Sequence, residues 1–250
     1  MVNNISRILL SASLFALSTT VNASLITNGS FEQLAFNDNT QVVGAANNTN
    51  LASYQSMGSA WDVFYTLPGW VTTAGSGIEL QKNVVTQSQD GATHVELDSD
   101  MKSAANTVMS QSLASLTVGA DYLLEFFYKP RTNAINDNGV QVFWYDSGTS
   151  FDQNMAAKFI VNGTKNITPS WVKQSVVLTA QAETMDISFG AFGMKNSFGG
   201  LIDNVSLVQV SNAKVSDIPE PSIFALSLLG FGLLVRRHTK LTKNKVLAGK

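Results

Sequence analysis

Apolar and polar residues alternate through most of the chain between residues 24 and 217. In the stretch THVELD, Val95 and Leu97 alternate with His94, Glu96 and Asp98, which is the two-residue period of a strand with one face buried. Similar runs, rich in β-branched and aromatic residues and bounded by Gly, Asn, Asp and Pro, predict eight strands. They lie at residues 78–81, 93–98, 107–113, 122–131, 140–145, 171–180, 185–192 and 201–210.

Two of these runs also indicate how the strands are layered. The stretch VQVFWY places Val140, Val142 and Trp144 on one face and Phe143 and Tyr145 on the other. The stretch YLLEFFYK is apolar on both faces, as expected for a central strand. Eight or nine short strands separated by turn residues predict an all-β domain, with a two-sheet sandwich favoured over a barrel.

One segment, residues 37–59, interrupts this succession of short strands and turns. It is rich in Asn, Ala, Ser, Gln and Thr and includes GAANNTN. It is too long for an ordinary connection, so it is either a functional loop or a flexible one. No segment between residues 24 and 217 shows the apolar period of a helix, so no helix is predicted there.

The two ends of the chain have a different character. At the N-terminus, Arg7, the apolar run 8–17 and the small-residue sequence VNA predict a signal peptide, residues 1–23, cleaved after Ala23. At the C-terminus, residues 222–235 form an apolar run without a charge. As a helix this run is about 21 Å long, which is short for a membrane span. Three interpretations follow: a core helix, a weak stop-transfer helix, or a sorting tail that is removed.

The charge of the chain is unevenly distributed. The whole chain has a net charge of −2, but residues 24–217 hold nine Lys or Arg against seventeen Asp or Glu, a net charge of −8. This acidic domain is a poor partner for nucleic acid or other polyanions, and it leaves neutral or cation-bridged polymers as partners. The chain has no cysteine, and His94 is the single histidine between the two terminal segments, which excludes thiol catalysis and a multi-histidine metal site.

The C-terminal segment resembles the PEP-CTERM sorting signal. The matching parts are the triplet Pro219, Glu220 and Pro221, the apolar run, and the basic pair Arg236 and Arg237. The resemblance implies a Gram-negative bacterium that makes exopolysaccharide and an exosortase-type membrane protease that processes the tail. It also implies that the apolar helix contacts the membrane before processing. The linker and tail together take residues 213–250, of which the basic end, 236–250, is longer than in the family pattern.

The remaining domain, residues 24–212, resembles the galactose-binding-domain-like jelly rolls, which include many non-catalytic carbohydrate-binding modules. The stretches that carry this resemblance are SLITNGSFEQ at the start, LPGW, and IDNVSL in the last strand. The resemblance implies a structural calcium ion held by Glu32 and Asp203, because calcium prefers carboxylate and carbonyl oxygens. The alternative is that Asp203 accepts hydrogen bonds from nearby backbone N–H groups.

Sugar binding requires exposed aromatic rings that stack on C–H faces, together with carboxylates, amides or Arg for the hydroxyl groups. Trp70 and Trp144 are predicted to lie in the core. The candidate ligand-binding residues, should they converge, are Trp61, Tyr65, Glu79, His94, Arg131 and Tyr145.

The sequence carries little sign of catalysis. Glu79, Glu96 and Asp98 are potential glycosidase carboxylates, but Glu96 and Asp98 are two residues apart on one strand, which is typical of a solvated face. No Gly-x-Ser-x-Gly elbow, phosphate loop or dinucleotide motif occurs. The sequence therefore predicts a non-enzymatic exported protein that binds exopolysaccharide at the cell surface or in the matrix. The alternative is a structural surface or biofilm protein without a specific glycan.

Overall fold

The computed structural model describes residues 23–34, 49–99, 105–163 and 170–210. These residues belong to one compact unit that ends at Val210. The predicted signal peptide up to residue 22, the sorting motif and the apolar run 222–235 lie outside the described residues. Within the described part of the chain, no helix is long and apolar enough to cross a membrane.

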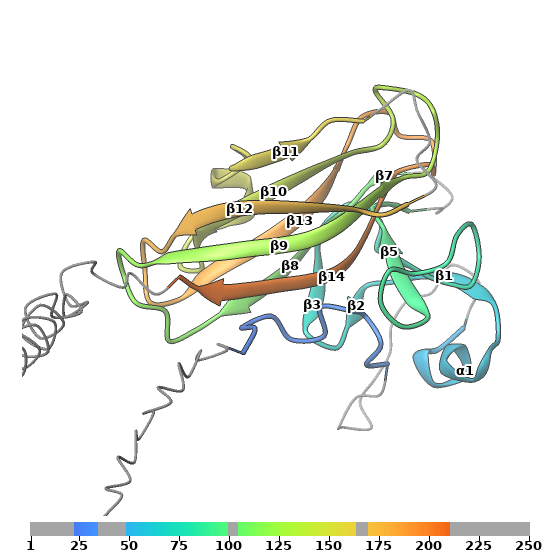
Figure 1. Ribbon diagram of the computed structural model, residues 1–250, viewed down its shortest axis with the longest axis horizontal. Coiled ribbons are helices and arrows are strands. Elements are labelled where there is room, and N and C mark those ends of the chain that lie inside the picture. Colours follow the sequence, from blue (N-terminus) through green and yellow to red (C-terminus); the bar gives the residue numbers. More distant parts are fainter. Residues whose placement is uncertain (1–22, 35–48, 100–104, 164–169, 211–250) are drawn as a thin grey trace, which may run out of the picture. The chain divides into compact units, whose positions relative to one another are not determined.

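The described chain folds into two six-stranded antiparallel sheets, which form two layers in Figure 1. Sheet A has the order β1 (Ala60–Phe64), β4 (Ile78–Lys82), β5 (Thr93–Glu96), β14 (Gly200–Gln209), β9 (Asp121–Pro130), β12 (Val172–Thr179). Sheet B has the order β11 (Phe159–Val161), β10 (Gly139–Asp146), β13 (Met185–Phe192), β8 (Val108–Leu113), β3 (Trp70–Ala74), β2 (Thr66–Leu67). A small hairpin pairs β6 (Asp98–Ser99) with β7 (Ala105–Asn106).

This arrangement confirms the predicted all-β, jelly-roll sandwich. Each of the eight predicted runs has a counterpart, whereas β1, β2, β3, β7 and β11 lie outside those runs. β9 lies between β14 and β12, as its two apolar faces indicated. In β10, Val140, Val142 and Trp144 join the core between the sheets, and Phe143 and Tyr145 lie on the opposite face, as the alternation predicted.

Aromatic side chains join the two sheets. Phe126 of β9 and Phe189 of β13 lie edge to face with ring centroids 5.1 Å apart. Trp70 is fully buried, as predicted, and packs against Phe189 and Phe31. Its indole Nε1 donates a 3.2 Å hydrogen bond to the carbonyl of Asn28, which satisfies the polar atom in the core.

The N-terminal segment lies beside the last strand. The backbone N–H of Leu25 donates to Leu207 of β14, and the N–H of Val205 donates to Gly29, with distances of 2.8 and 2.9 Å. The two segments that resemble the jelly-roll family, NGSFE and IDNVSL, are therefore neighbours in space.

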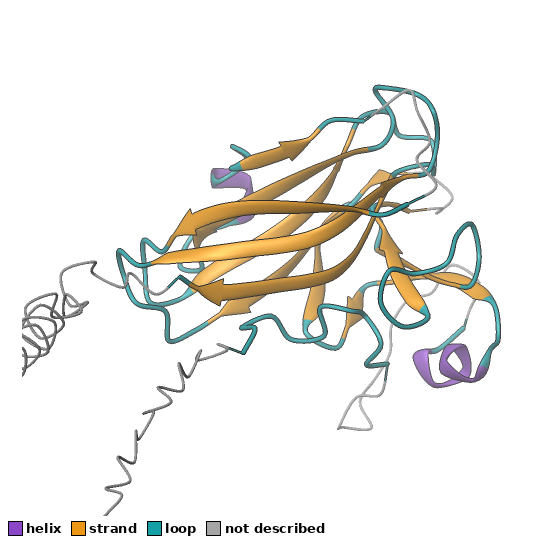
Figure 2. Ribbon diagram, viewed as in Figure 1, coloured by secondary structure: helices purple, strands orange, loops and turns teal. Residues whose placement is uncertain are grey.

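Helical structure is scarce, as Figure 2 shows, but it is not absent. The expectation of no helix is wrong for α1 (Leu51–Ser56), which lies in the interrupted segment 37–59. The Asn50 side chain caps this helix by accepting a 2.8 Å hydrogen bond from the N–H of Ser53. Leu51 and Tyr54, three residues apart, are buried, so one apolar face suffices to order a helix of this length. The other helical element among the described residues is η1 (Phe151–Gln153).

The turn between β2 and β3 depends on Gly69, whose φ is +84°. A Cβ at this position would lie 2.9 Å from the backbone oxygen of Thr27. We expect Gly69→Ala to lower the free energy of unfolding by about 2 kcal/mol or more, because backbone strain and a clash with backbone combine. Gly119 is the matched control, since it has φ +80° and no atom within 4 Å of a Cβ. Gly119→Ala should cost about 1 kcal/mol in the same urea titration; equal losses would contradict the packing argument.

Candidate functional site

The face of sheet A that points away from sheet B carries a row of polar residues. In β4 and β5, Leu80 and Val95 point into the core, so their neighbours Glu79, Gln81, His94 and Glu96 point to this outer face. In the sequence, Glu96 and Asp98 were interpreted as part of a solvated face. That interpretation is wrong, because both are fully buried, and so is His94.

Glu79 and Glu96 lie directly opposite each other on β4 and β5. The amide Nε2 of Gln81 donates to both carboxylates, at 2.8 Å to Glu79 and 2.5 Å to Glu96. Glu96 also accepts a 2.7 Å hydrogen bond from the N–H of Gly199 and forms an ion pair with Arg131. Burial raises the pKa of Glu96 well above its ordinary value, and the nearby Glu79 raises it further, which outweighs the opposing effect of Arg131.

His94 extends this network away from the two carboxylates. Because Gln81 uses its amide nitrogen on the glutamates, its Oε1 accepts from His94 Nε2 at 3.1 Å, and His94 Nδ1 accepts from the Ser88 hydroxyl at 2.9 Å. Burial, together with the charges of Lys129 and Arg131, lowers the pKa of His94 to about 3. A neutral imidazole of such low basicity is a poor general base, which does not favour a hydrolytic dyad of Ser88 and His94.

Aromatic rings border the polar row. Trp61 of β1 lies opposite Gln81, and Trp171, which precedes β12, lies edge to face with His94 at 5.5 Å. Both tryptophans are half-buried. The guanidinium of Arg131 lies 4.7 Å from the ring centre of Phe198, which is 44% exposed. We call Trp61, Trp171, Arg131 and Phe198 the aromatic rim.

The connection between β4 and β5, residues 83–92, is fastened to several strands of sheet A. Lys129 of β9 donates to the Thr86 hydroxyl at 2.6 Å, and the indole of Trp171 donates to the Gln87 carbonyl at 2.9 Å. Figure 1 shows this connection as the green segment beside β5. On the same sheet face, Glu79 and Glu96 are at most 2% exposed, while the residues of the aromatic rim are partly or largely exposed.

The structure brings some of the predicted ligand-binding residues together. Glu79, His94 and Arg131 belong to one hydrogen-bonded network, and Trp61 is next in the same row. Tyr65 is half exposed and lies where the chain passes from β1 in sheet A to β2 in sheet B.

Tyr145 does not present the exposed ring expected of it. It is 4% exposed on the outer face of sheet B, where it packs against Phe151 and its hydroxyl lies 3.2 Å from that of Ser188. Its apolar neighbours and the η1 segment cover this face, so Tyr145 lies apart from the network on sheet A.

Three members of the site were missed by the sequence reasoning. Gln81 is the residue that joins the two halves of the network, and its alternation with Leu80 was a usable signal. Trp171 and Phe198 come from segments far away in the sequence, and no local pattern indicated that they reach the β5 region.

The two predicted calcium ligands both hold the segment 89–93. Glu32 Oε1 accepts from the N–H groups of Ala92 and Thr93, at 2.8 and 2.6 Å, and from the Thr93 hydroxyl at 2.6 Å. Asp203 Oδ2 accepts from the N–H groups of Gln89 and Asp90, at 2.7 and 2.9 Å. Both carboxylates therefore accept hydrogen bonds from backbone N–H groups, which was the alternative to calcium binding for Asp203. In the described residues no three His, Asp or Glu side chains converge to hold a metal ion, and calcium at Glu32 and Asp203 stays a prediction.

Asp203 makes the stability of the fold depend on pH. Burial raises its pKa from 3.8 to about 7, despite the hydrogen bonds from Asp90, Asn204 and Gln89. The folded state therefore binds a proton that the unfolded state lacks between about pH 4 and pH 7, and this term lowers stability as the pH rises through that window. His94 has the opposite effect on the free energy of unfolding. Because its pKa is lowered in the fold, its contribution to stability increases as the pH rises from about 3 to 6.5.

We expect Asp203→Asn to remove the contribution of Asp203 to the pH dependence of stability. The free energy of unfolding of the native chain minus that of the variant should fall between about pH 4 and pH 7 and level off above it. Urea titrations of both proteins across this range measure the difference. A difference that grows with pH would contradict the assignment.

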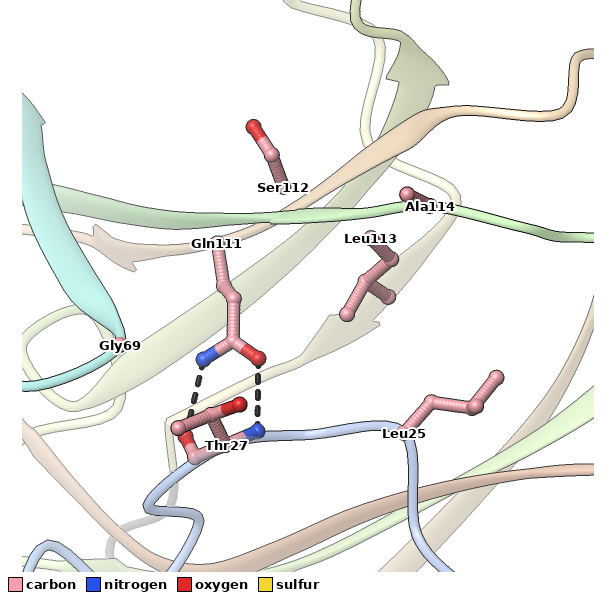
Figure 3. Close-up of a pocket in the computed structure, with 7 residues that line it drawn as sticks. All are labelled: Leu25, Thr27, Gly69, Gln111, Ser112, Leu113 and Ala114. Atoms are coloured by element: carbon pink, nitrogen blue, oxygen red, sulfur yellow. Dashed lines mark hydrogen bonds between the residues drawn. The ribbon is translucent and has the colours of Figure 1, made fainter.

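Figure 3 shows a pocket beside the N-terminal segment. It has a volume of about 230 Å³, and its lining residues are Leu25, Thr27, Gly69, Gln111, Ser112, Leu113 and Ala114. The Gln111 amide pairs with the backbone of Thr27 through hydrogen bonds of 2.7 and 2.9 Å. The lining has no charged side chain and its amide is already paired, so the outer face of sheet A is the better candidate site.

The fold and the site thus define a jelly-roll β-sandwich with a polar, aromatic-rimmed face on one sheet. No protein-family model matches the chain. The multifunctional-autoprocessing repeats-in-toxin protein of Vibrio cholerae is 26% identical over 152 residues, and that of Vibrio vulnificus is 27% identical over 154 residues. Each match covers 61% of this chain, and the chain spans about 3% of the length of these curated relatives.

The solved structures that match part of this chain include a cyclase and carbohydrate-binding modules. The Stig cyclase Fisc from Fischerella sp. TAU has a TM-score of 0.48 at 15% identity, and the match covers 76% of this chain and 98% of that chain. A CBM4 structure has a TM-score of 0.36 at 16% identity, with 74% and 99% covered. TmCBM61 in complex with β-1,4-galactotriose has a TM-score of 0.40 at 16% identity, with 56% and 88% covered. At these scores, the assignment of the fold rests on the strand pairing of the chain itself.

Proposed function

We propose that this chain is a non-catalytic carbohydrate-binding protein and that its aromatic rim binds the glycan. The observation that carries the proposal is the row Trp61, Gln81, His94 and Trp171, in which two half-buried indoles flank fixed polar side chains on one sheet face. Indole rings offer flat apolar surfaces for the C–H faces of sugars, and Arg131 and nearby carbonyls offer partners for hydroxyl groups. The net charge of −8 over residues 24–217 favours neutral glycans or acidic glycans bridged by cations.

Burial of the two glutamates favours binding over catalysis. A glycosidase would need Glu79 and Glu96 to reach the scissile bond, but both lie beneath the chain's own segments. Incubating the protein with each glycan that it binds and assaying reducing ends tests this point. Release of sugar that is lost in Glu96→Gln would overturn the non-catalytic assignment.

A structural surface protein is the second candidate. The observation that favours it is the β4–β5 connection, which fills part of the sheet face with the chain's own residues. The two candidates differ in one result. Affinity electrophoresis through gels containing xylan, β-glucan, mannan or alginate should retard a glycan-binding protein on at least one of them and a purely structural one on none.

The proposal includes export and processing. The sequence features that support it are the apolar N-terminal segment ending at Ala23 and the tail with Pro219, Glu220, Pro221, Arg236 and Arg237. The chain would then act at the cell surface or in the extracellular matrix of a Gram-negative bacterium, after an exosortase-type protease has removed the tail. Mass spectrometry of the protein recovered from the producing cells should give an N-terminus at Ser24 and a C-terminus near Pro219. An intact tail would refute processing.

Calcium at Glu32 and Asp203 belongs to the same proposal as a structural element. Glu32 is exposed, and its Oε2 accepts no hydrogen bond from a described residue, which leaves an oxygen for a cation. Bound calcium would hold the segment 89–93 and, through it, the connection that borders the rim. Comparing glycan binding in calcium and in EDTA, with Glu32→Gln as the variant, tests this role. Binding that is identical in all conditions would exclude it.

A further inference from the structure

Among the buried polar atoms of the described chain, three side-chain oxygens have no hydrogen-bond partner. They are Oδ1 of Asp98, Oδ1 of Asn106 and Oδ1 of Asp137. Asp98 is 0% exposed and Asp137 is 5% exposed. An unsatisfied buried polar group costs about 1–3 kcal/mol, and a charged one more, so three such oxygens require an explanation.

The three oxygens come from segments that pack against one another. Asp98 of β6 is paired directly with Asn106 of β7, so their side chains lie on the same side of the hairpin. The Asn106 amide nitrogen donates a 3.1 Å hydrogen bond to the Gly193 carbonyl. Gly193 in turn packs on the β9–β10 connection, where a Cβ on Gly193 would lie 3.1 Å from the Cα of Asp137. Gly193 therefore joins the hairpin to the segment that holds Asp137.

The other polar atom of each side chain is already fixed. Asp98 Oδ2 accepts from the N–H groups of Asn196 and Ser197, at 2.8 and 2.9 Å. Asp137 Oδ2 accepts from the Thr132 hydroxyl at 2.7 Å. These bonds hold the carboxylates in place and leave one oxygen of each unpartnered. In the described part of the chain the ion pairs are Arg131–Glu96 and Lys173–Glu125, so neither aspartate has a cationic side chain as a partner.

We propose that Asp98, Asn106 and Asp137 bind one calcium ion. Calcium takes six to eight oxygens from carboxylates, amides, backbone carbonyls and water, in flexible geometry. Two carboxylate oxygens and one amide oxygen supply the charged and neutral ligands of such a site, and water or backbone carbonyls supply the rest. A cation satisfies all three oxygens together and compensates two buried negative charges. The site shares no residue with the one predicted at Glu32 and Asp203.

The ion would brace the segment 193–199. That segment also provides the Gly199 N–H that binds Glu96 and the Ser197 carbonyl that accepts from Arg131 at 3.0 Å. It carries Phe198 of the aromatic rim as well. Calcium at this site would therefore order one end of the rim, a consequence that rests on the proposed function, whereas the metal site itself does not.

Isothermal titration of the full-length chain with calcium chloride, after removal of metals with EDTA, tests the proposal. We expect saturable binding, a rise in Tm with calcium, and a loss of affinity of about tenfold or more in both Asp98→Asn and Asp137→Asn. Asp152→Asn, at an exposed carboxylate of η1 that belongs to neither calcium site, is the control and should retain binding.

Two results would overturn the proposal. One is the absence of calcium binding and of any change in Tm, which would mean that water alone occupies the space between these oxygens. The other is binding of equal affinity in the native chain and in Asp137→Asn, which would place the ion elsewhere. If Asp98→Asn fails to fold, Asp137→Asn still decides the outcome, because Asp137 lies in a loop. No glycan enters this titration, so its failure would leave the carbohydrate proposal standing.

Discussion

Replacing Arg131 by methionine is expected to lower the free energy of unfolding by about 3–5 kcal/mol at a pH at which Glu96 is ionised in the fold, because it leaves a buried carboxylate without its counter-charge. Glu96 is fully buried, and Arg131 is its ion-pair partner. Methionine keeps most of the aliphatic stem, so the loss reports chiefly on the charge and its hydrogen bonds.

The loss in Arg131→Met should also depend on pH. Folding raises the pKa of Glu96 above its ordinary value of 4.5, so the ionised form destabilises the fold increasingly as the pH rises above that value. Removing Arg131 strengthens this effect. The difference in stability between the native chain and the variant should therefore be smallest at low pH, where Glu96 is protonated in both folded proteins, and should grow once the pH rises through the raised pKa of Glu96 in the native fold.

Two further variants separate the charge effect from a general loss of packing. Glu96→Gln introduced into Arg131→Met should recover part of the stability, because a neutral amide replaces the unpaired carboxylate. Lys173→Met removes the other ion pair, Lys173–Glu125, in which the lysine side chain is 50% exposed, and should cost at most about 1 kcal/mol. A loss in Arg131→Met that is the same at every pH would contradict the assignment of the raised pKa to Glu96.

Trp61→Ala and Trp171→Ala should each weaken glycan binding by about 30-fold or more. Central aromatic residues of binding sites commonly contribute 2 kcal/mol or more, which corresponds to that factor in Kd. Both rings border the row that runs through Gln81 and His94, so each would form part of the stacking surface. Calorimetric titration of the variants with a glycan that the native chain binds measures the effect.

Phe192→Ala is the matched control for the tryptophan variants. Phe192 is 43% exposed but lies at the end of β13 in sheet B, away from the proposed rim. Its removal should leave Kd unchanged. Equal losses in all three variants, or a fall in Tm that accounts for the loss, would show that the tryptophans act through stability.

Much of the sandwich was predictable because strand alternation is a local property of the sequence. The two faces of β10 followed directly from VQVFWY, and the burial of Trp70 followed from the Pro-Gly turn before it. The sequence pattern did not predict the helix α1, because one buried pair, Leu51 and Tyr54, and one capping residue, Asn50, are enough to order its six residues. Patterns that short do not stand out in a polar segment.

The site was less predictable, because its burial depends on contacts between distant segments. His94 and Glu96 alternate with apolar neighbours as solvated residues do, and local sequence does not show what covers them. The partners that change their environment, Arg131 and Trp171, lie at the ends of other strands. Polar residues on the outer face of a sheet are therefore ambiguous until the crossing segments are placed.

The measurement that tests the central claim most directly is titration of the native chain into the exopolysaccharide of the bacterium that produces it. The account predicts saturable binding that is lost in Trp171→Ala and retained in Phe192→Ala. Absence of binding to this polymer, with calcium and with EDTA, would contradict a carbohydrate-binding role and leave the structural surface protein as the better description.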